Sequence, residues 1–450
     1  MVLVGRFGIG NCIRAWFTFL LIVVCLYLHA QDIDSAPVQL TLQSAVKIAL
    51  RQNIEVLIAT IEVATRGQDR VLARSELIPH AGVTADNAVS RYNLKAQIGV
   101  QIPGFPNSIG PYNSIHVGSS FSGPIFDLTL LERYKATSHL LAASRENQQA
   151  IREQTVLLTV SEYMAHLRAL ASISAAESQV KLALRLDQQA KDLRTDGVAT
   201  GIDVSRAEVR LREEQQKLMD AKRDADVSLY ALRRILNFPD AQQILFSDQQ
   251  ELFTTPSLNL DNPLADALAQ RPEMHELADQ IIATKAEHRA AVAESLPSLS
   301  LIGSWNEQGE TFNTLTPGYE YRFEFKLPLF SGGRLTAERR QTALSEEKVQ
   351  KQLIDERDRV TEEVRDSQME LEAAKNDVEL GQQEVQLANE QVALSEGRFR
   401  SGVTDNIEVV AAQDALARAN DTEIGALYRY NIARAQLAHA VGKEEETYSH

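Results

Sequence analysis

Two stretches of this chain lack proline and glycine over a length that no compact domain can hold. The first runs from Ile125 to Asp196, and the second runs from Arg334 to Leu380. In addition, no proline follows Pro328. Because proline and glycine are the residues that most often interrupt helices, the two stretches favour very long helices.

The first of these helices is predicted over residues 128–195. About 68 residues at about 1.5 Å per residue give a rod of about 100 Å. A compact domain of about 200 residues is only about 40 Å across. The long helices are therefore expected to lie side by side in an elongated wall, and the fold class is predicted to be mainly α with a small β part.

The chain carries an internal repeat. Its landmarks recur in the same order in two copies: Pro79, Pro124 and Gly197 in the first, and Pro297, Pro328 and Gly402 in the second. Their separations are 218, 204 and 205 residues. The separation between the two copies decreases between the first landmark and the second. The first copy is therefore expected to have the longer connection between its strands.

The repeat predicts a division of the chain into four parts, with two strands in each repeat. The first hairpin is expected to turn at a segment containing Pro103, Pro106 and Pro111. The parts are a signal peptide at 1–30, a first helix-hairpin-helix repeat at 31–237 with strands at about 80–121, a linker at 238–262, and a second repeat at 263–450 with strands at about 298–327.

The segment Tyr319–Leu327 alternates apolar and charged residues with a period of two. This alternation is typical of a membrane strand that faces lipid on one side and an aqueous lumen on the other, over about 9–11 residues. Four strands per chain cannot enclose an aqueous pore, and open sheet edges are not tolerated in lipid. At least three chains are therefore expected to share one barrel.

The second long helix has a heptad pattern with large residues at one seam position and small residues at the other. The large residues are Val364, Leu371, Val378, Val385 and Val392, and the small ones are Ser367, Ala374, Gly381, Ala388 and Ser395. Such a seam predicts long antiparallel coiled-coil helices whose backbones approach closely.

The N-terminus has the features of a secretory signal peptide. Arg6 and Arg14 precede or flank an apolar run, Ala15–Leu28, which is shorter than the roughly 20 residues that span a bilayer. Both cysteines, Cys12 and Cys25, lie inside this segment. Lipid attachment at Cys25 is disfavoured because Val24 is not a small residue, so the exported chain is expected to have no thiol and no disulfide.

Composition argues against several functions. The formal charge is −15 and only 6% of the residues are aromatic, which does not suggest a nucleic-acid partner. The histidines are scattered outside any metal-ligand spacing, and no nucleophile elbow or phosphate-binding glycine loop occurs. We therefore expect no enzyme activity and no cofactor.

Several motifs resemble the TolC-like outer membrane efflux protein family over about residues 40–442. They are Leu-Pro-Ser-Leu-Ser-Leu at 296–301, Leu-Pro-Leu-Phe-Ser-Gly-Gly-Arg at 327–334, Gly-Val-Thr at 402–404, Ile-Glu-Val-Val at 407–410 and Ala-Gln-Asp at 412–414. The resemblance implies a homotrimer with a twelve-stranded barrel in outer membrane lipid and a twelve-helix tunnel in the periplasm. It further implies a passive exit duct for efflux or type I secretion.

In that family the helical turns at the periplasmic tip meet an adaptor protein, which connects the duct to an inner-membrane transporter. On this chain the resemblance assigns adaptor contact to two turns. They contain Gly197, Val198 and Ala199 in the first repeat, and Gly402, Val403 and Thr404 in the second.

The family often lines a closed iris with two acids one turn apart, together with tyrosine and arginine latches. Glu408 matches the first acid, but Ala411 replaces the second, Phe399 replaces the tyrosine and Thr404 replaces the arginine. Asp405, with Asp203 in the other repeat, is a candidate for compensating negative charge at the constriction. The alternative is that these acids only favour the start of a helix.

Trp305, Tyr319 and Tyr321 are candidates for an aromatic belt at the membrane surface, with core packing as the alternative. The competing interpretation of the whole chain is a periplasmic or surface coiled-coil scaffold or receptor that forms no channel. The sequence does not distinguish drug, metal-ion and protein cargo.

Overall fold

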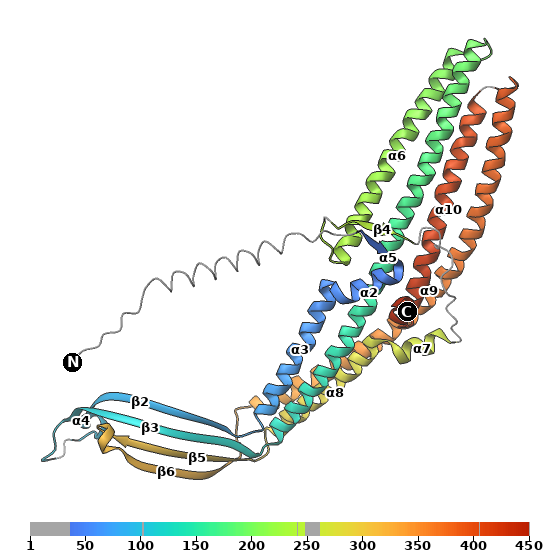
Figure 1. The fold of residues 1–450 in the computed structure, drawn as a ribbon. Helices are drawn as coiled ribbons and strands as arrows, with labels where there is room; N and C mark the ends of the chain where they lie inside the picture. The colour runs from blue at the N-terminus through green and yellow to red at the C-terminus, as the bar shows by residue number, and fades with distance from the viewer. Residues whose placement is uncertain (1–36, 101–102, 241, 248–261, 405, 450) are drawn as a thin grey trace, which may run out of the picture.

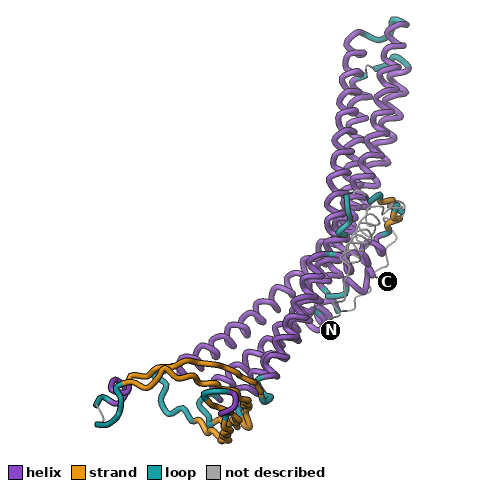
Figure 2. Tube along the Cα trace, turned by 60° about the vertical axis from the view of Figure 1, so that its left-hand side comes forward, coloured by secondary structure: helices purple, strands orange, loops and turns teal. Residues whose placement is uncertain are grey.

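A computed structural model describes residues 37–100, 103–240, 242–247, 262–404 and 406–449. The predicted signal peptide, with Cys25, lies outside the described residues, and so does Asp405. The molecule is elongated, with a small sheet at one end and helical turns at the other (Figure 1). Figure 2 shows that the helical part bends between the two ends.

The sheet has four antiparallel strands in the order β2-β3-β5-β6. Their bounds are His80–Asn93 for β2, Ser108–Phe126 for β3, Ser298–Gly309 for β5 and Thr316–Lys326 for β6. The short helix α4, Leu94–Ile98, lies between β2 and β3, and the 3-10 turn η1, Phe312–Thr314, lies between β5 and β6. Residues 94–107 connect the first pair and residues 310–315 the second, so the first connection is longer, as predicted.

One detail of the first hairpin was predicted wrongly. Pro111 lies inside β3, not in the turn. The pairing of β2 with β3 shifts register between Ser90 and Tyr92, and Pro111 has no partner in the ladder. An unpaired residue at a bulge does not donate its backbone N–H to the neighbouring strand. Proline, which has no backbone N–H, is therefore accommodated there.

Pairing places apolar and polar side chains on opposite faces of the sheet, because paired residues share a face. One face carries Ala81, Val83, Phe121, Leu299, Leu301, Trp305, Tyr319, Tyr321, Phe323 and Phe325. The other carries Thr84, His116, Ser120, Ser300, Ser304, Asn306, Glu320, Arg322 and Glu324. The alternation predicted for β6 therefore extends across all four strands.

Long helices continue from the strands. The half of the helical wall next to the sheet contains α3 (Ile54–Ser75), α5 (Leu128–Thr195), α8 (Pro272–Ala293) and α9 (Arg334–Arg400), packed in that order. In the far half, α6 (Gly201–Ile235) packs on α5, and α10 (Ile407–Ala440) packs between α5 and α9. The predicted helix at 128–195 and the predicted wall are confirmed.

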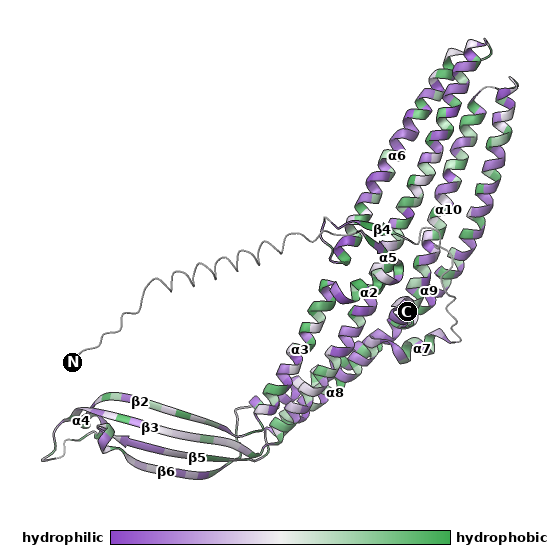
Figure 3. Cartoon of the chain, in the orientation of Figure 1, coloured by the Kyte–Doolittle hydropathy of each residue, from purple (hydrophilic) through white to green (hydrophobic). Residues whose placement is uncertain are grey.

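Apolar and polar residues alternate at short intervals along these helices (Figure 3). No helix of the described part combines the length and apolarity needed to cross a membrane.

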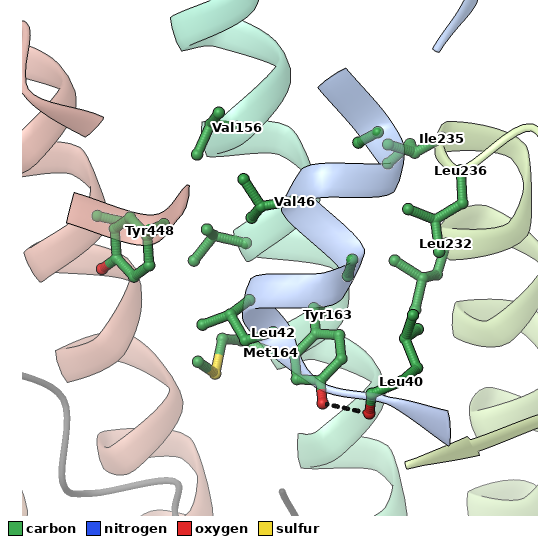
Figure 4. Packing of buried hydrophobic residues seen from close by; sticks show 14 of the residues in the cluster. Leu40, Leu42, Val46, Val156, Tyr163, Met164, Leu232, Ile235, Leu236 and Tyr448 are labelled. Carbon is green, nitrogen blue, oxygen red and sulfur yellow. Dashed lines mark hydrogen bonds between the residues drawn. The ribbon is translucent and has the colours of Figure 1, made fainter. Parts of the chain in front are cut away.

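The largest apolar core lies at the waist, where short elements surround the middle of α5. These elements are β1 (Val38–Leu40), α2 (Leu42–Gln52), β4 (Ile244–Phe246) and α11 (Glu444–Ser449). A further short helix, α7 (Pro263–Gln270), packs on α9 and α8 instead. The core joins Leu40, Tyr163 and Leu232 with Tyr448, and the Tyr163 hydroxyl donates a hydrogen bond to the Leu40 carbonyl at 3.2 Å (Figure 4). The segment predicted as a linker contributes β4, which pairs in parallel with β1.

Two buried carboxyl groups meet where α11 begins. Glu153 Oε2 accepts the backbone N–H groups of Glu444 and Glu445 at 3.0 and 2.9 Å. Glu444 is fully buried, and its Oε2 lies 3.0 Å from His439 Nδ1. Burial and the neighbouring Glu153 raise the pKa of Glu444 well above its usual value, and burial lowers the pKa of His439.

Because the pKa of Glu444 is higher in the folded state than in the unfolded chain, the folded protein binds this proton more tightly. The corresponding stability is present below the ordinary pKa of 4.5 and is lost as pH rises toward the folded-state value. We therefore expect Glu444→Gln to raise the thermal midpoint of the detergent-solubilised protein at pH 8, with the gain disappearing near pH 4. The control is Glu446→Gln, because Glu446 is exposed on the same helix. A gain that is independent of pH would contradict this account.

The seam between α9 and α10 follows the predicted heptad. Val364, Ser367, Ala374, Gly381, Ala388, Val392 and Ser395 are all buried. A Cβ atom on Gly381 would lie 3.1 Å from the Cα atom of Glu423 on α10. Glycine at this position therefore permits the close approach of the two backbones.

Gly381→Leu is expected to separate α9 from α10 and to destabilise the protein by about 1–3 kcal/mol through overpacking. The matched control is Gly397→Leu on the same helix, where a Cβ atom meets nothing within 4 Å. That change is expected to be neutral or stabilising by up to about 1 kcal/mol, because glycine is a poor helix former. Thermal denaturation followed by circular dichroism compares the two variants, and equal midpoints would contradict the prediction.

Candidate functional site

The two helical turns that face away from the sheet form the candidate site (Figure 1). Each turn ends its helix in the same way. Gly197 has φ 76° and Gly402 has φ 70°, the left-handed conformation that favours glycine. The next residue then donates its N–H to a helix carbonyl: Val198 to Leu193 at 2.9 Å, and Val403 to Arg398 at 3.1 Å.

These turns present apolar side chains to solvent. Val198 is 59% exposed and Val403 is 68% exposed, while Ala199 and Thr404 are partly buried. Ile202 and Ile407, one turn further along, are also exposed. The four branched side chains occupy matching places in the two repeats, and all six predicted adaptor-contact residues lie in these turns.

Asp203 lies beside the first turn but caps its own helix. Thr200 and Asp203 form a capping box: the Thr200 N–H and hydroxyl donate to Asp203 Oδ2 at 2.9 and 2.6 Å. Burial opposes ionisation of Asp203, but the hydrogen bonds from Thr200 and the charge of Arg206 outweigh it and lower the pKa of this carboxyl group. The structure thus shows a buried helix cap at this position.

Asn406 joins the second turn to α6. It is fully buried, and its Nδ2 donates to the backbone carbonyl of Asp203 at 2.8 Å. Its Oδ1 accepts a hydrogen bond from Arg206 Nη1 at 2.7 Å. One amide side chain therefore ties the start of α10 to the start of α6.

An ion pair between a buried arginine and a partly exposed aspartate forms a second link between the same helices. Arg210 on α6 pairs with Asp414 on α10 and with Glu214 on its own helix, whose carboxylate lies 3.1 Å away. Arg210 and Glu214 are both buried. We call Arg206, Arg210, Asn406 and Asp414 the tip clamp, because they connect the two tip turns through side chains.

The other predicted iris residues differ in environment. Glu408 lies in the first turn of α10, partly exposed, 3.5 Å from Arg398 Nη1. Phe399, at the family's tyrosine position, is buried against Leu186 and Val409. Asp405 lies outside the described residues, so its position relative to Glu408 stays a prediction.

Sequence reasoning missed the tip clamp. Arg206 and Arg210 are four residues apart on α6, a spacing that places both on one helix face. Asp414 follows Gly402 by nearly as many residues as Arg210 follows Gly197, which places the two at similar heights. Matching charges across the repeat could have suggested the ion pair, but the contacts of Asn406 leave no such pattern.

The predicted belt residues lie together on the apolar face, in the middle part of β5 and β6. Trp305 and Tyr319 stack with ring centroids 6.0 Å apart, and Tyr319 contacts Tyr321 at 5.9 Å. All three side chains are exposed in the single chain. They stay candidates for a belt, since exposure alone does not show contact with lipid.

Comparison with known proteins supplies the family. The model of the outer membrane efflux protein family matches residues 45–237 and 264–443. The chain belongs to this family. It is therefore an outer membrane efflux channel, and its helices extend into the periplasm.

Two curated relatives are similar over most of their length. The alkaline protease secretion protein AprF of Pseudomonas aeruginosa is 24% identical over 74% of this chain and 71% of its own length. The probable efflux pump outer membrane protein TtgC of Pseudomonas putida is 23% identical over 89% of this chain and 82% of its own. Among solved structures, the CmeC outer membrane channel of Campylobacter jejuni superposes with a TM-score of 0.78 at 19% identity, covering 90% of this chain and 86% of CmeC. This likeness confirms the predicted fold.

Proposed function

We propose that three copies of this chain close into one duct that serves as the passive outer membrane exit of an efflux or type I secretion system. The observation that carries the proposal is the open sheet that continues into an open helical wall. Both parts end in edges that a second copy of the chain can cover.

The sheet edges fit such closure. Among the described residues, β2 and β6 each pair with one neighbour only, so both have a free row of backbone hydrogen-bonding groups. All strand pairs in the sheet are antiparallel, so β6 of one copy would also run antiparallel to β2 of the next. In lipid these groups require partners, and three copies supply twelve strands around an aqueous lumen.

The edges of the helical wall also fit closure by further copies of the chain. The order of packing leaves α3, α6 and α9 at the margins of the wall. These helices carry large apolar side chains that are more than half exposed: Ile54, Ile58 and Ile61 on α3, Val209, Met219 and Val227 on α6, and Leu380, Leu387 and Leu394 on α9. On the described parts of the interior helices α5, α8 and α10, no large apolar side chain exceeds 50% exposure. Apolar surface concentrated at two margins supports closure with further copies.

The protein partners of the duct are inferred from the two helical turns at its tip. The exposed apolar turns at 197–199 and 402–404 suit a periplasmic adaptor protein, which would connect the duct to an energised inner-membrane transporter. The names of two relatives, for protease secretion and for efflux, support this class of assembly. The duct itself is proposed to perform no chemistry and to bind no cofactor.

The test is the oligomeric state and conductance of the purified exported chain. We expect extraction from the outer membrane only with detergent, a mass of three chains by light scattering, and ion conductance in planar bilayers. A monomer that is stable in plain buffer would overturn the proposal and would favour the coiled-coil scaffold. A crosslinker placed at Ala199 or Thr404 should capture the adaptor, and capture only at positions remote from the turns would reject the assigned contact.

A further inference from the structure

Four short uncharged segments lie where the strands meet the helices. Residues 77–79, 295–297 and 327–333 lie between elements, and residues 122–126 are the end of β3. Each segment contains a proline, and each is bounded on its helix side by a charged residue: Glu76, Asp127, Glu294 or Arg334. We call these four segments the collar, because they lie together where the sheet meets the helices (Figure 1).

The collar exposes large apolar side chains. Phe330 is 91% exposed and Leu329 is 89% exposed, the highest values among the exposed large apolar side chains of the described residues. The equivalent residues of the first repeat, Phe126 and Ile125, are also more than half exposed. Ile78, Leu296 and Leu327 complete the exposed set. Such a surface is costly in water, so it requires an apolar environment.

This surface continues the apolar face of the sheet. Phe126 pairs with Leu299, which lies on the apolar face, and Leu327 follows Phe325 of that face in the same alternation. The polar face has no such continuation: Lys326 and Glu324 belong to it, and neither is part of the collar. The collar is therefore contiguous with the surface that an outer membrane channel turns toward lipid.

The apolar alternation of β5 and β6 is too short to supply the whole apolar band. On β6 the apolar alternation runs from Tyr319 to Phe325, which at about 3.4 Å per residue and a tilt of about 40° covers roughly 16 Å of depth. The apolar band of outer membrane barrels is about 25 Å tall. At the far end the band cannot extend much, because Glu307 pairs with Pro317 on the same face. The missing depth lies on the collar side.

Charged residues limit the band immediately beyond the collar. Arg334 Nη2 lies 2.9 Å from Glu294 Oε1, and Arg334 Nη1 lies 2.7 Å from Glu338 Oε1. Arg334 and Glu294 flank the collar in sequence, and the Arg334 side chain is half exposed. An exposed ion network of this kind belongs in water, so the boundary falls between Phe330 and Arg334.

We propose that the collar, and Leu329 and Phe330 in particular, is embedded in the periplasmic leaflet of the outer membrane, below the end of the strands. Its partner is the acyl-chain region of the lipid. The collar fixes the depth of the channel: the helices leave the membrane at Arg334, and every residue beyond it lies in the periplasm. This inference rests on the outer membrane location of the sheet and not on the number of copies.

The test uses the tryptophan content of the chain. Trp16 lies in the predicted signal peptide, so Trp305 is the single tryptophan of the exported chain. In a Trp305→Phe background, Phe330→Trp reports on the collar, and Leu344→Trp, an exposed position further along α9, is the matched control. Each full-length variant is reconstituted in phosphatidylcholine vesicles that carry bromine at a shallow or at a deep acyl position. Bromine quenches tryptophan only at short range.

We expect shallow bromine to lower Phe330→Trp emission at least twofold, deep bromine to lower it less, and neither to affect Leu344→Trp. An unquenched Phe330→Trp would overturn the proposal. Red-shifted emission would then place the collar in water, and blue-shifted emission would place it under a second copy of the chain. The unsubstituted protein, with Trp305 in place, tests the membrane position of the sheet separately. If Trp305 is quenched and Phe330→Trp is not, only the proposed position of the collar in the membrane is rejected. If neither is quenched, the membrane position of the sheet is rejected as well.

Discussion

Leu380→Glu, Leu387→Glu and Leu394→Glu, combined in one variant, are expected to leave the purified protein monomeric and without conductance. The three leucines are spaced by seven residues along α9 and are 56%, 65% and 70% exposed. In a closed wall they would be covered by the neighbouring copy. A carboxylate buried without a partner costs several kcal/mol, and three copies would bury nine of them. Light scattering in detergent measures the mass, and planar bilayers measure the conductance.

The matched control is Gln386→Glu on the same helix. Residue 386 is exposed, one residue before Leu387, and a step of one residue turns the helix by about 100° away from the leucine face. The control should remain trimeric and conducting. If the triple variant also remains trimeric, the margins of the wall are not the interface, and the proposed closure fails even if the protein stays in the outer membrane.

Asn406→Ala is expected to release the second tip turn from α6. The change removes the hydrogen bond to the Asp203 carbonyl and the charge-assisted bond from Arg206, and it leaves the partly exposed Arg206 guanidinium with one partner fewer. A lost bond of this kind costs about 1.5–3 kcal/mol. Since the Arg210 link would remain, Asn406→Ala combined with Asp414→Asn should have the larger effect.

Distances between spin labels can measure this release, because both cysteines lie in the predicted signal peptide. Labels on Val198→Cys and Val403→Cys should show a longer and broader distance distribution in the Asn406→Ala variant. Glu408→Gln is the control: its pair with Arg398 is exposed at 3.5 Å, so little change is expected. An unchanged distribution in the double variant would show that the tip is held by other contacts.

The features predicted correctly from sequence are those set by local chemistry. The long helices follow from the absence of proline and glycine, and the two turns follow from Gly197 and Gly402, which must adopt a left-handed conformation. The seam of α9 follows from its heptad. Each of these signals lies within a few residues of the structure that it specifies.

The features that were missed depend on residues far apart in sequence. Asn406 contacts Asp203 and Arg206 about 200 residues away, so its role has no local pattern. The strand β4 forms only because β1 offers a partner at the waist. In contrast, the cap at Asp203 has a local signal, since Thr-x-x-Asp opens α6, and it agrees with the helix-start alternative that the sequence left open.

The waist core has a consequence for biogenesis. It brings Leu40 into one cluster with Tyr448, which lies 408 residues later in the sequence. Contacts of such high sequence separation form slowly, because the intervening chain must lose its freedom first. The waist core therefore cannot close until the segment that contains Tyr448 has joined the rest of the chain in the periplasm, and until then the apolar side chains of this core stay exposed to water.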